Sequence, residues 1–213
     1  MADEGLQTLL WERREPPFAG SWALPGGYLA PGESLEASAR RHLREKVGLV
    51  EVGHLEQLET RSEPERDPRG WTVTTAFLAL AAPHAEPSAP PDTAWHPVAA
   101  PPALAFDHDA LLALAAERLR GKATYTNIAF ALVDAAFTIA ELRRAYEAVL
   151  GHPVDATNLQ RVLQRAGVLE PTGARGAPVG GRGRPPELFR FTERTLTVSK
   201  PLAAFRPSRR PGP

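Results

Sequence analysis

The residues best suited to chemistry lie between Gly26 and Leu49, in the stretch GGYLAPGESLEASARRHLREKVGL. The residues whose types and spacing matter in this stretch are two glycines, three charged residues and two leucines, namely Gly27, Glu33, Arg41, Leu43, Glu45, Gly48 and Leu49. A carboxylate such as Glu45 suits Mg²⁺ on a pyrophosphate, because this cation prefers hard oxygen ligands in near-octahedral array. The neighbouring positions hold His42 and Lys46. An ammonium repels a divalent cation and can contact an anion such as phosphate directly, so a carboxylate that suits a cation is followed by a charge that opposes one.

A helix must position these side chains, and its ends can be predicted. Ser34 can cap the start, Glu36 lies in the first turn where negative charge is favoured, and Gly48 ends the helix. Residues at four-residue spacing are expected to form the buried stripe, namely Leu35, Ala39, Leu43 and Val47. Positions 42, 45 and 46 then share another face, at roughly 100° per residue. We expect Glu33 to pair with Arg41 and to hold the preceding loop onto the helix.

This spacing resembles the Nudix box, G-x5-E-x7-R-E-U-x-E-E-x-G-U, where U is a bulky aliphatic residue. His42 replaces the first catalytic Glu of that signature and Lys46 replaces the last. The resemblance implies a domain that still recognises a nucleotide diphosphate but no longer cuts it, with no required cofactor and at most weak Mg²⁺ binding at Glu45. Three alternatives stay open: a plain amphipathic surface helix, a softer metal held by His42 with Glu45, and an active pyrophosphatase on ADP-ribose-like substrates.

Composition allows two domains of different charge. The 213 residues are 43% apolar, enough to fill real cores, and include no cysteine, which excludes disulfides and fits a reducing cytoplasm. The N-terminal sequence lacks the features of a signal peptide, and no apolar stretch is long enough to span a bilayer. Residues 1–121 carry 11 basic against 18 acidic residues, whereas residues 122–213 carry 14 against 7. The basic second half suggests a polyanionic partner.

The order of secondary structure also changes along the chain. Strands are expected in QTLLWERRE, in HLEQLETR, in WTVTTAFLALA and in a short TAWHPV segment. From Asp109 onward the pattern is helical, in DALLALAAERLRGK, TNIAFALVDAAF, TIAELRRAYEAVLG and DATNLQRVLQRAGVL. The strand-like ELFRFTER follows a stretch rich in glycine, arginine and proline.

The last two of these helices have helix-turn-helix spacing. Thr138 and Glu141 form a capping box, Gly151 ends the first helix, and Asp155 can cap the second after a short turn. On the second helix an apolar side is predicted to face inward, namely Leu159, Val162, Leu163 and Ala166. The outward residues are of types that contact DNA, namely Thr157, Asn158, Arg161, Gln164 and Arg165, beside Gln160.

The segment PTGARGAPVGGRGRPPELFRF resembles the wing of a winged helix. Arg182 and Arg184 lie in its glycine-rich tip, from which they can reach phosphates or a minor groove. The alternative is a small helical domain with a solvated polar face and an ordinary hairpin. The charge difference between the two halves of the chain favours the DNA-binding interpretation.

From about Leu10 to Phe191 the chain resembles the NrtR family of Nudix-related transcriptional regulators. The resemblance is carried by PPFAGSWALPGGYL, ESLEASARRHLREKVGL, LEQLETRSEPERDPRGW, LAFDHDALL, YTNIAFAL, FTIAELRRAYEAVLG and LFRF. It implies an α/β Nudix sandwich, a mixed sheet with flanking helices, followed by an α+β winged helix-turn-helix domain. It also implies a homodimeric repressor of NAD-metabolism or sugar-use genes. Its partners would be a palindromic double-stranded DNA operator and an effector such as ADP-ribose.

On this basis we expect residues 1–106 to form the effector domain, 107–121 a linker helix, 122–200 the DNA-binding domain and 201–213 a basic, disordered tail. The resemblance places the effector around Trp22, Arg41, Glu45, Lys46 and Arg69, with Phe18 nearby. Trp22 can stack on adenine, although a core role beside the loop is equally compatible with its position. Arg69 has little structural reason to stand in the loop DPRG, and an arginine fork suits a diphosphate.

Two departures from the family pattern bear on these expectations. Family members usually begin with an additional apolar strand, whereas only MADEGL precedes Gln7 here. Either this strand is absent or the start codon was assigned too late, so the resemblance does not define the edge of the pocket. The recognition helix is less basic than is usual for the family, with Ala156, Thr157 and Gln160 at positions that often hold cations. Operator sequence and salt dependence are therefore expected to differ as well.

Overall fold

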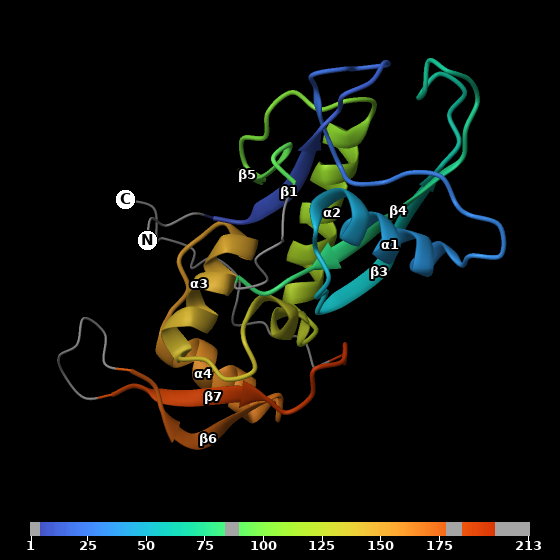
Figure 1. Cartoon of the computed structure of the whole chain (residues 1–213). Coiled ribbons are helices and arrows are strands. Elements are labelled where there is room, and N and C mark those ends of the chain that lie inside the picture. Colours follow the sequence, from blue (N-terminus) through green and yellow to red (C-terminus); the bar gives the residue numbers. More distant parts are fainter. Residues whose placement is uncertain (1–4, 84–89, 178–184, 199–213) are drawn as a thin grey trace, which may run out of the picture. The chain divides into compact units, whose positions relative to one another are not determined.

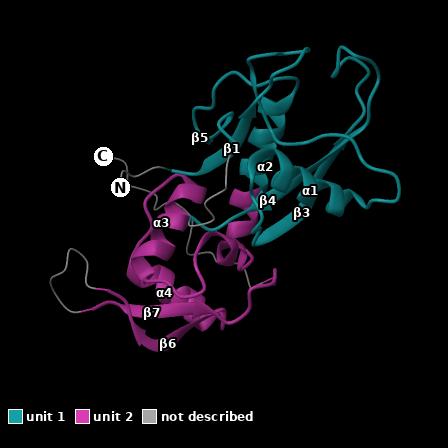
Figure 2. Ribbon diagram, in the orientation of Figure 1, with its two compact units in different colours: residues 1–118 teal, residues 119–213 magenta. Residues whose placement is uncertain are grey.

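The computed structural model describes residues 5–83, 90–177 and 185–198. The chain divides into two compact units, residues 1–118 and 119–213 (Figure 2). Helix α2 (His108–Ala123) begins in the first unit and ends in the second. The expected tail, residues 201–213, lies outside the described residues.

Unit 1 contains two antiparallel sheets and helix α1 (Leu35–Val47) (Figure 1). The three-stranded sheet has the order β2-β1-β5, built from β2 (Trp22–Ala23), β1 (Gln7–Glu12) and β5 (Thr93–Pro97). The second sheet pairs β3 (His54–Arg61) with β4 (Thr74–Leu80), with a register shift between Gln57 and Glu59. The strands expected from the sequence are therefore present.

Helix α1 packs an apolar face against β1. Leu43 and Val47 form a buried cluster with Leu9 and Leu49, and Trp11 covers part of it. The predicted stripe is wrong at its start, because Leu35 is 46% exposed. The buried face instead turns toward Ser38 and His42, since the loop that precedes α1 covers this side of the helix.

Unit 2 holds a short 3-10 helix η1 (Ile128–Leu132), α3 (Ile139–Leu150), α4 (Ala156–Arg165), and the antiparallel pair β6 (Leu169–Arg175) and β7 (Glu187–Phe191). The prediction of a helix through residues 126–137 is wrong, because only η1 forms. The buried Asn127 side chain donates to the carbonyls of Glu193 and Thr195 and accepts from the Thr197 amide. These bonds tie the start of the segment to the chain after β7, and Val133 is already extended.

The core of unit 2 joins α3 and α4 to the β6–β7 hairpin. Leu142, Leu159 and Leu163 are fully buried, as is Phe137. The Phe137 backbone exchanges two hydrogen bonds with Phe189 of β7, at 3.0 and 2.7 Å. Two helices followed by a hairpin, with a short extra strand contact at Phe137, is the architecture expected of a winged helix. Within the described ranges, no helix is long and apolar enough to cross a membrane.

Candidate effector and DNA-binding sites

The loop and helix of the Gly26–Leu49 stretch adopt the predicted frame. The Ser34 side chain accepts from the Ala37 amide at 3.1 Å and caps α1. Gly48 ends the helix with φ 66°, a left-handed conformation that glycine adopts without a steric penalty. Both ends of α1 are therefore fixed by local interactions, and its polar side chains stand at defined positions beside the loop.

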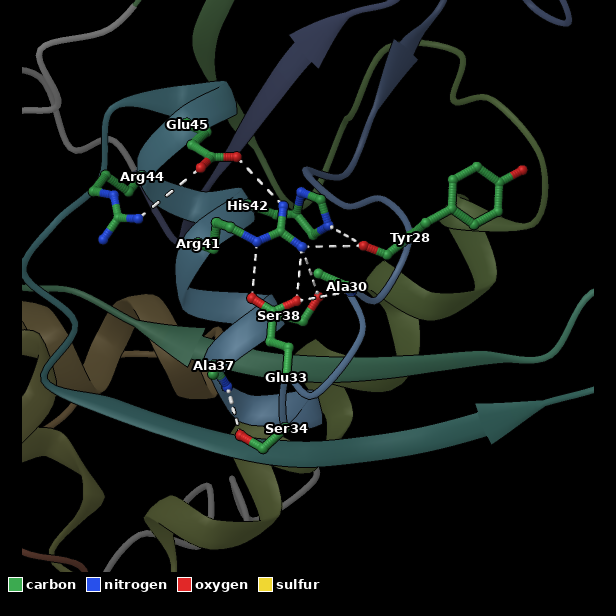
Figure 3. Close-up of polar contacts among 10 residues, drawn as sticks. All are labelled: Tyr28, Ala30, Glu33, Ser34, Ala37, Ser38, Arg41, His42, Arg44 and Glu45. Carbon is green, nitrogen blue, oxygen red and sulfur yellow. Dashed lines mark hydrogen bonds and ion pairs between the residues drawn. The ribbon is translucent and has the colours of Figure 1, made fainter.

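An ion pair anchors the loop onto the helix (Figure 3). Arg41 binds Glu33 through two hydrogen bonds, Nε to Oε1 and Nη2 to Oε2, both 2.8 Å long. Arg41 also donates to the Tyr28 carbonyl at 3.1 Å, while Glu33 accepts from the Ala30 amide. The Arg41 hydrogen bonds lower the pKa of Glu33 to about 2. The expected Glu33–Arg41 pair is confirmed, and the Arg41 guanidinium is already engaged by it.

His42 lies beneath the loop instead of on the open face of the helix. It is 9% exposed, and its Nε2 lies 3.1 Å from the Tyr28 carbonyl. Because a carbonyl only accepts, Nε2 carries the proton and donates (Figure 3). A Cβ at Gly27 would overlap the His42 ring, so this ring needs a glycine above it. Of the three residues predicted to share one face of α1, His42 is thus the one that the loop covers.

Glu45 and Lys46 have different surroundings. The Glu45 carboxylate is about half exposed and lies 3.4 Å from Arg41 Nη1 and 4.0 Å from Arg44. The Lys46 ammonium lies over the Trp11 ring, 4.0 Å from its centroid. Burial lowers the pKa of Lys46, and the positive charge of Arg13 lowers it further.

These residues do not fit the Mg²⁺ that the Nudix box implies. One carboxylate, Glu45, faces two arginines, His42 is bound to the loop backbone, and Lys46 supplies a positive charge. In the described part of the chain, no group of three or more metal-ligating side chains is found. Among positions 42, 45 and 46, only Glu45 therefore offers the oxygen ligand that Mg²⁺ prefers.

The structure places Trp22 apart from Lys46. Trp22 pairs with Glu12 across β2 and β1, whereas Trp11 pairs with Ala23. Directly opposite residues of an antiparallel pair share a face, and successive residues alternate, so Trp22 and Trp11 lie on opposite faces of the sheet. The Trp22 ring packs edge-on against His96, with centroids 4.4 Å apart. The sheet therefore separates Trp22 from the Lys46 ammonium.

Arg69 has the structural role that the sequence did not suggest. Its guanidinium donates to both oxygens of the buried Asp67, at 3.0 and 2.7 Å, and the hydrogen bonds from Arg69 lower the pKa of Asp67. The expectation that Arg69 lacks a structural reason was therefore wrong. The Arg69 side chain nevertheless stays 46% exposed, and its guanidinium carbon lies 5.6 Å from the Phe106 ring centroid. Its charge can still reach a ligand at the surface.

An aromatic and cationic cluster around Phe106 was missed by sequence reasoning. Phe18 and Phe106 meet edge-on with centroids 4.8 Å apart, and both have positive φ, 64° and 56°. Such a backbone is strained for bulky residues, and strained positions concentrate at functional sites. Arg13 lies over the Phe106 ring at 4.8 Å. No periodicity predicts this cluster, because Phe106 is far in sequence from Arg13 and Phe18; the aromatic and basic residues in WERREPPF, which includes Arg13 and Phe18, were the available signal.

Asp107 and His108 fix the start of α2 inside unit 1. Asp107 accepts hydrogen bonds from Arg61 at 3.1 Å and from Arg66 at 2.7 Å. Burial raises the pKa of Asp107, but the hydrogen bonds from these two arginines outweigh it, so the pKa is lowered. His108 accepts from the Leu24 amide, and burial lowers its pKa to about 4. The first turn of α2 is thus tied to β3, to the loop before β4, and to the segment after β2.

In unit 2, local caps position the helix-turn-helix. Thr138 and Glu141 form the predicted capping box, and Gly151 ends α3 with φ 74°. Asp155 caps α4 by accepting from the Asn158 amide at 2.7 Å. Leu159 and Leu163 face the core and Val162 is half-buried, as expected, whereas Ala166 is exposed because α4 ends there. The expected helix-turn-helix geometry is therefore present.

The outward side of α4 presents a row of polar side chains. Asn158 is half-buried and holds the exposed Arg161 through a 2.5 Å hydrogen bond from Arg161 Nη2 to Asn158 Oδ1. The predicted residues of this side largely line one surface pocket, made by Thr157, Gln160, Arg161, Gln164 and Arg165. The structure therefore brings the predicted DNA-contacting residues of α4 together. Arg182 and Arg184, predicted at the wing tip, lie outside the described residues.

The fold and these sites define a winged helix attached to a Nudix-type domain, and comparisons with known proteins agree. Residues 1–115 match the NUDIX domain family, and residues 129–191 match the NrtR DNA-binding winged helix domain. The ADPR responsive transcriptional repressor NtrR of Acinetobacter baylyi is 37% identical over 202 residues, which cover 89% of this chain and 77% of that protein. The chain belongs to the NrtR family.

Two further similarities cover different shares of the chain. The solved structure of Shewanella oneidensis NrtR complexed with a 27mer DNA is 36% identical, with a TM-score of 0.79, and the match covers 90% of this chain and 89% of that one. The ADP-ribose pyrophosphatase of Methanocaldococcus jannaschii is 40% identical over 73 residues, 34% of this chain and 42% of that enzyme.

Proposed function

We propose that this protein is a DNA-binding transcriptional repressor whose operator affinity is controlled by ADP-ribose or a related phosphorylated metabolite. The observation that carries this proposal is the outward row on α4, where Asn158 positions Arg161 beside Gln164 and Arg165. Asn, Gln and Arg are the side chains that recognise base edges by paired hydrogen bonds in the major groove. Membership of the NrtR family and the similarity to a repressor named as ADPR responsive support it.

The effector site is proposed on the surface of unit 1 beside the loop before α1. Lys46, Arg69 and Glu45 supply its charged groups, and the partly exposed Phe18 supplies a ring on which a base can stack. Arg41 acts there through the loop that it anchors to Glu33. Trp22 supports the site from the far side of the sheet.

The DNA partner is proposed to be a palindromic duplex bound by a homodimer. Two recognition helices related by a twofold axis then fit half-sites about one helical turn apart, or a multiple of it. The regulated genes would be those of NAD metabolism or pentose use, as the family membership suggests. Helix α2 is the proposed lever between effector and DNA, because its first turn is tied to unit 1 and its last turn belongs to unit 2.

A pull-down of genomic DNA fragments with the full chain, followed by sequencing, tests the DNA-binding half. We expect recovered fragments to share a palindrome, and ADP-ribose to release them more than NAD, ADP or pentose phosphates do. Arg69→Ala should weaken this release while leaving DNA capture intact. Fragments without a common sequence would contradict the proposal.

The second candidate function is hydrolysis of ADP-ribose-like substrates, which the similarity to an ADP-ribose pyrophosphatase favours. The surroundings of His42 and Lys46 argue against it, because cleavage requires cations that neutralise the leaving phosphate. Release of AMP from ADP-ribose in Mg²⁺, well above a Glu45→Gln control, would favour the enzyme.

A further inference from the structure

Three cations and two aromatic rings form a continuous series beside α1. Lys46 lies 4.0 Å from the Trp11 ring centroid, and Arg13 lies 5.9 Å from the same centroid. Arg13 is also 4.8 Å from the centroid of Phe106, and Arg69 is 5.6 Å from it on this second ring. The rings hold the positive charges close to one another, which costs free energy unless an anion is present.

Two of these charges have no acidic partner among the described residues. Arg69 is paired with Asp67, but neither Lys46 nor Arg13 forms an ion pair there. Arg13 Nε donates to the Pro17 carbonyl at 2.9 Å and its Nη2 to the Glu15 carbonyl at 3.4 Å, so its guanidinium is positioned by backbone contacts that do not neutralise it. A half-buried ammonium and a fixed guanidinium thus lie around the Trp11 ring, each without an acidic partner among the described residues.

Two positions that bind the cation in the Nudix box hold other residue types in this chain, His42 and Lys46. His42 Nε2 donates directly to the Tyr28 carbonyl, so a protein hydrogen bond holds the loop on the helix at this position. Lys46 stands at the position of the last carboxylate of the box. It supplies a positive charge where the box would supply a negatively charged ligand for a metal ion. The charge that a diphosphate needs can therefore come from the protein itself.

We propose that Lys46 and Arg13 form a metal-independent site for the diphosphate of a nucleoside diphosphate such as ADP-ribose, an inference that rests on the proposed effector function. Lys46 acts as a mobile point charge, and Arg13 presents N–H groups from a fixed plane. The anion relieves the repulsion between the two cations, and the free guanidinium edge of Arg69 extends the site along Phe106. Mg²⁺ takes no part in binding.

Calorimetry on the full chain tests this site. ADP-ribose should bind equally well in EDTA and in Mg²⁺, and inorganic pyrophosphate should compete with it, whereas adenosine should not. Lys46→Glu and Arg13→Gln should each weaken ADP-ribose binding in EDTA on the order of 10- to 100-fold, the effect of losing one charge-assisted hydrogen bond. Mg²⁺ should restore part of the loss in Lys46→Glu, because carboxylates then stand at positions 45 and 46. Lys46→Arg should bind like the parent.

Arg40→Glu is the matched control, since it reverses a charge on the same helix where Arg40 pairs only with Glu36 among the described residues. It should bind ADP-ribose like the parent, and thermal melting should confirm that every variant is folded. Binding by the parent that requires Mg²⁺, or unchanged binding by Lys46→Glu in EDTA, overturns the site even if ADP-ribose still releases DNA. If pyrophosphate binds in a Lys46-dependent way but ADP-ribose does not bind at all, the anion site is supported. The same result contradicts ADP-ribose as the effector.

Discussion

Arg161 offers the sharpest test of the recognition surface. Its guanidinium is exposed on α4, and the 2.5 Å hydrogen bond to Asn158 fixes its orientation before DNA binds. A bidentate contact between arginine and guanine contributes about 1–3 kcal/mol of discrimination. In the proposed homodimer Arg161 acts twice, so Arg161→Ala should cost about 2–6 kcal/mol of operator binding, roughly 30-fold to 10⁴-fold in Kd.

Fluorescence anisotropy with the operator, a shuffled duplex and a salt series measures this effect. Arg161→Ala should weaken operator binding much more than binding to shuffled DNA and should relax base preference at one position of each half-site. Arg161→Lys keeps the charge but loses the fork, so it should also relax that preference. Arg40→Ala, which removes one positive charge from α1 in unit 1, should bind as the parent does. An equal loss on both duplexes with a smaller salt slope would refute base recognition by Arg161 and assign it to phosphate.

Two further predictions concern the loop and helix of unit 1. The parent protein should release no more AMP from ADP-ribose in Mg²⁺ than a Glu45→Gln control does. The double variant His42→Glu, Lys46→Glu should recover measurable cleavage. Turnover by the parent protein in a coupled assay would contradict this prediction. The pKa of Glu33 is lowered from 4.5 to about 2 in the folded protein. The Glu33–Arg41 ion pair therefore stabilises the fold fully above pH 4.5, and this stabilisation is lost as the pH falls through about 2. An NMR titration should therefore give Glu33 a midpoint near 2, and Arg41→Gln should move it toward 4.5.

Local signals predicted the elements whose ends are made by neighbouring residues. Ser34 and Gly48 bound α1, and Thr138 with Glu141 begins α3, because caps act within one turn of the chain. Asp155 begins α4 for the same reason. The Glu33–Arg41 pair was also predictable, since its partners lie in a loop and in the helix that directly follows it.

Long-range packing decided what the sequence could not predict. Helical spacing placed His42 on one face with Glu45 and Lys46, but it could not show that the loop containing Gly27 covers His42. The face of the sheet that Trp22 occupies depends on its pairing with Glu12, which is a matter of strand register. The stacking of Arg13 on Phe106 joins segments more than ninety residues apart, a separation that no local pattern reports.

The helical pattern of residues 126–137 failed for a related reason. The apolar residues from Ile128 to Ala131 are buried as expected of a core segment, but the buried Asn127 binds carbonyls after β7. These tertiary hydrogen bonds fix the start of η1, and the backbone is already extended at Val133, directly after η1. Propensity is a weak prior where a buried polar side chain has fixed partners elsewhere.

Reciprocal titration tests the central claim, that one chain couples an effector site to DNA binding. If ADP-ribose and operator bind different arrangements of the protein, each must weaken the other by the same factor, typically about 5- to 150-fold for couplings of about 1–3 kcal/mol. We predict that saturating ADP-ribose raises the operator Kd and that saturating operator raises the ADP-ribose Kd by an equal factor within this range. ADP-ribose binding that leaves the operator Kd unchanged would contradict the account.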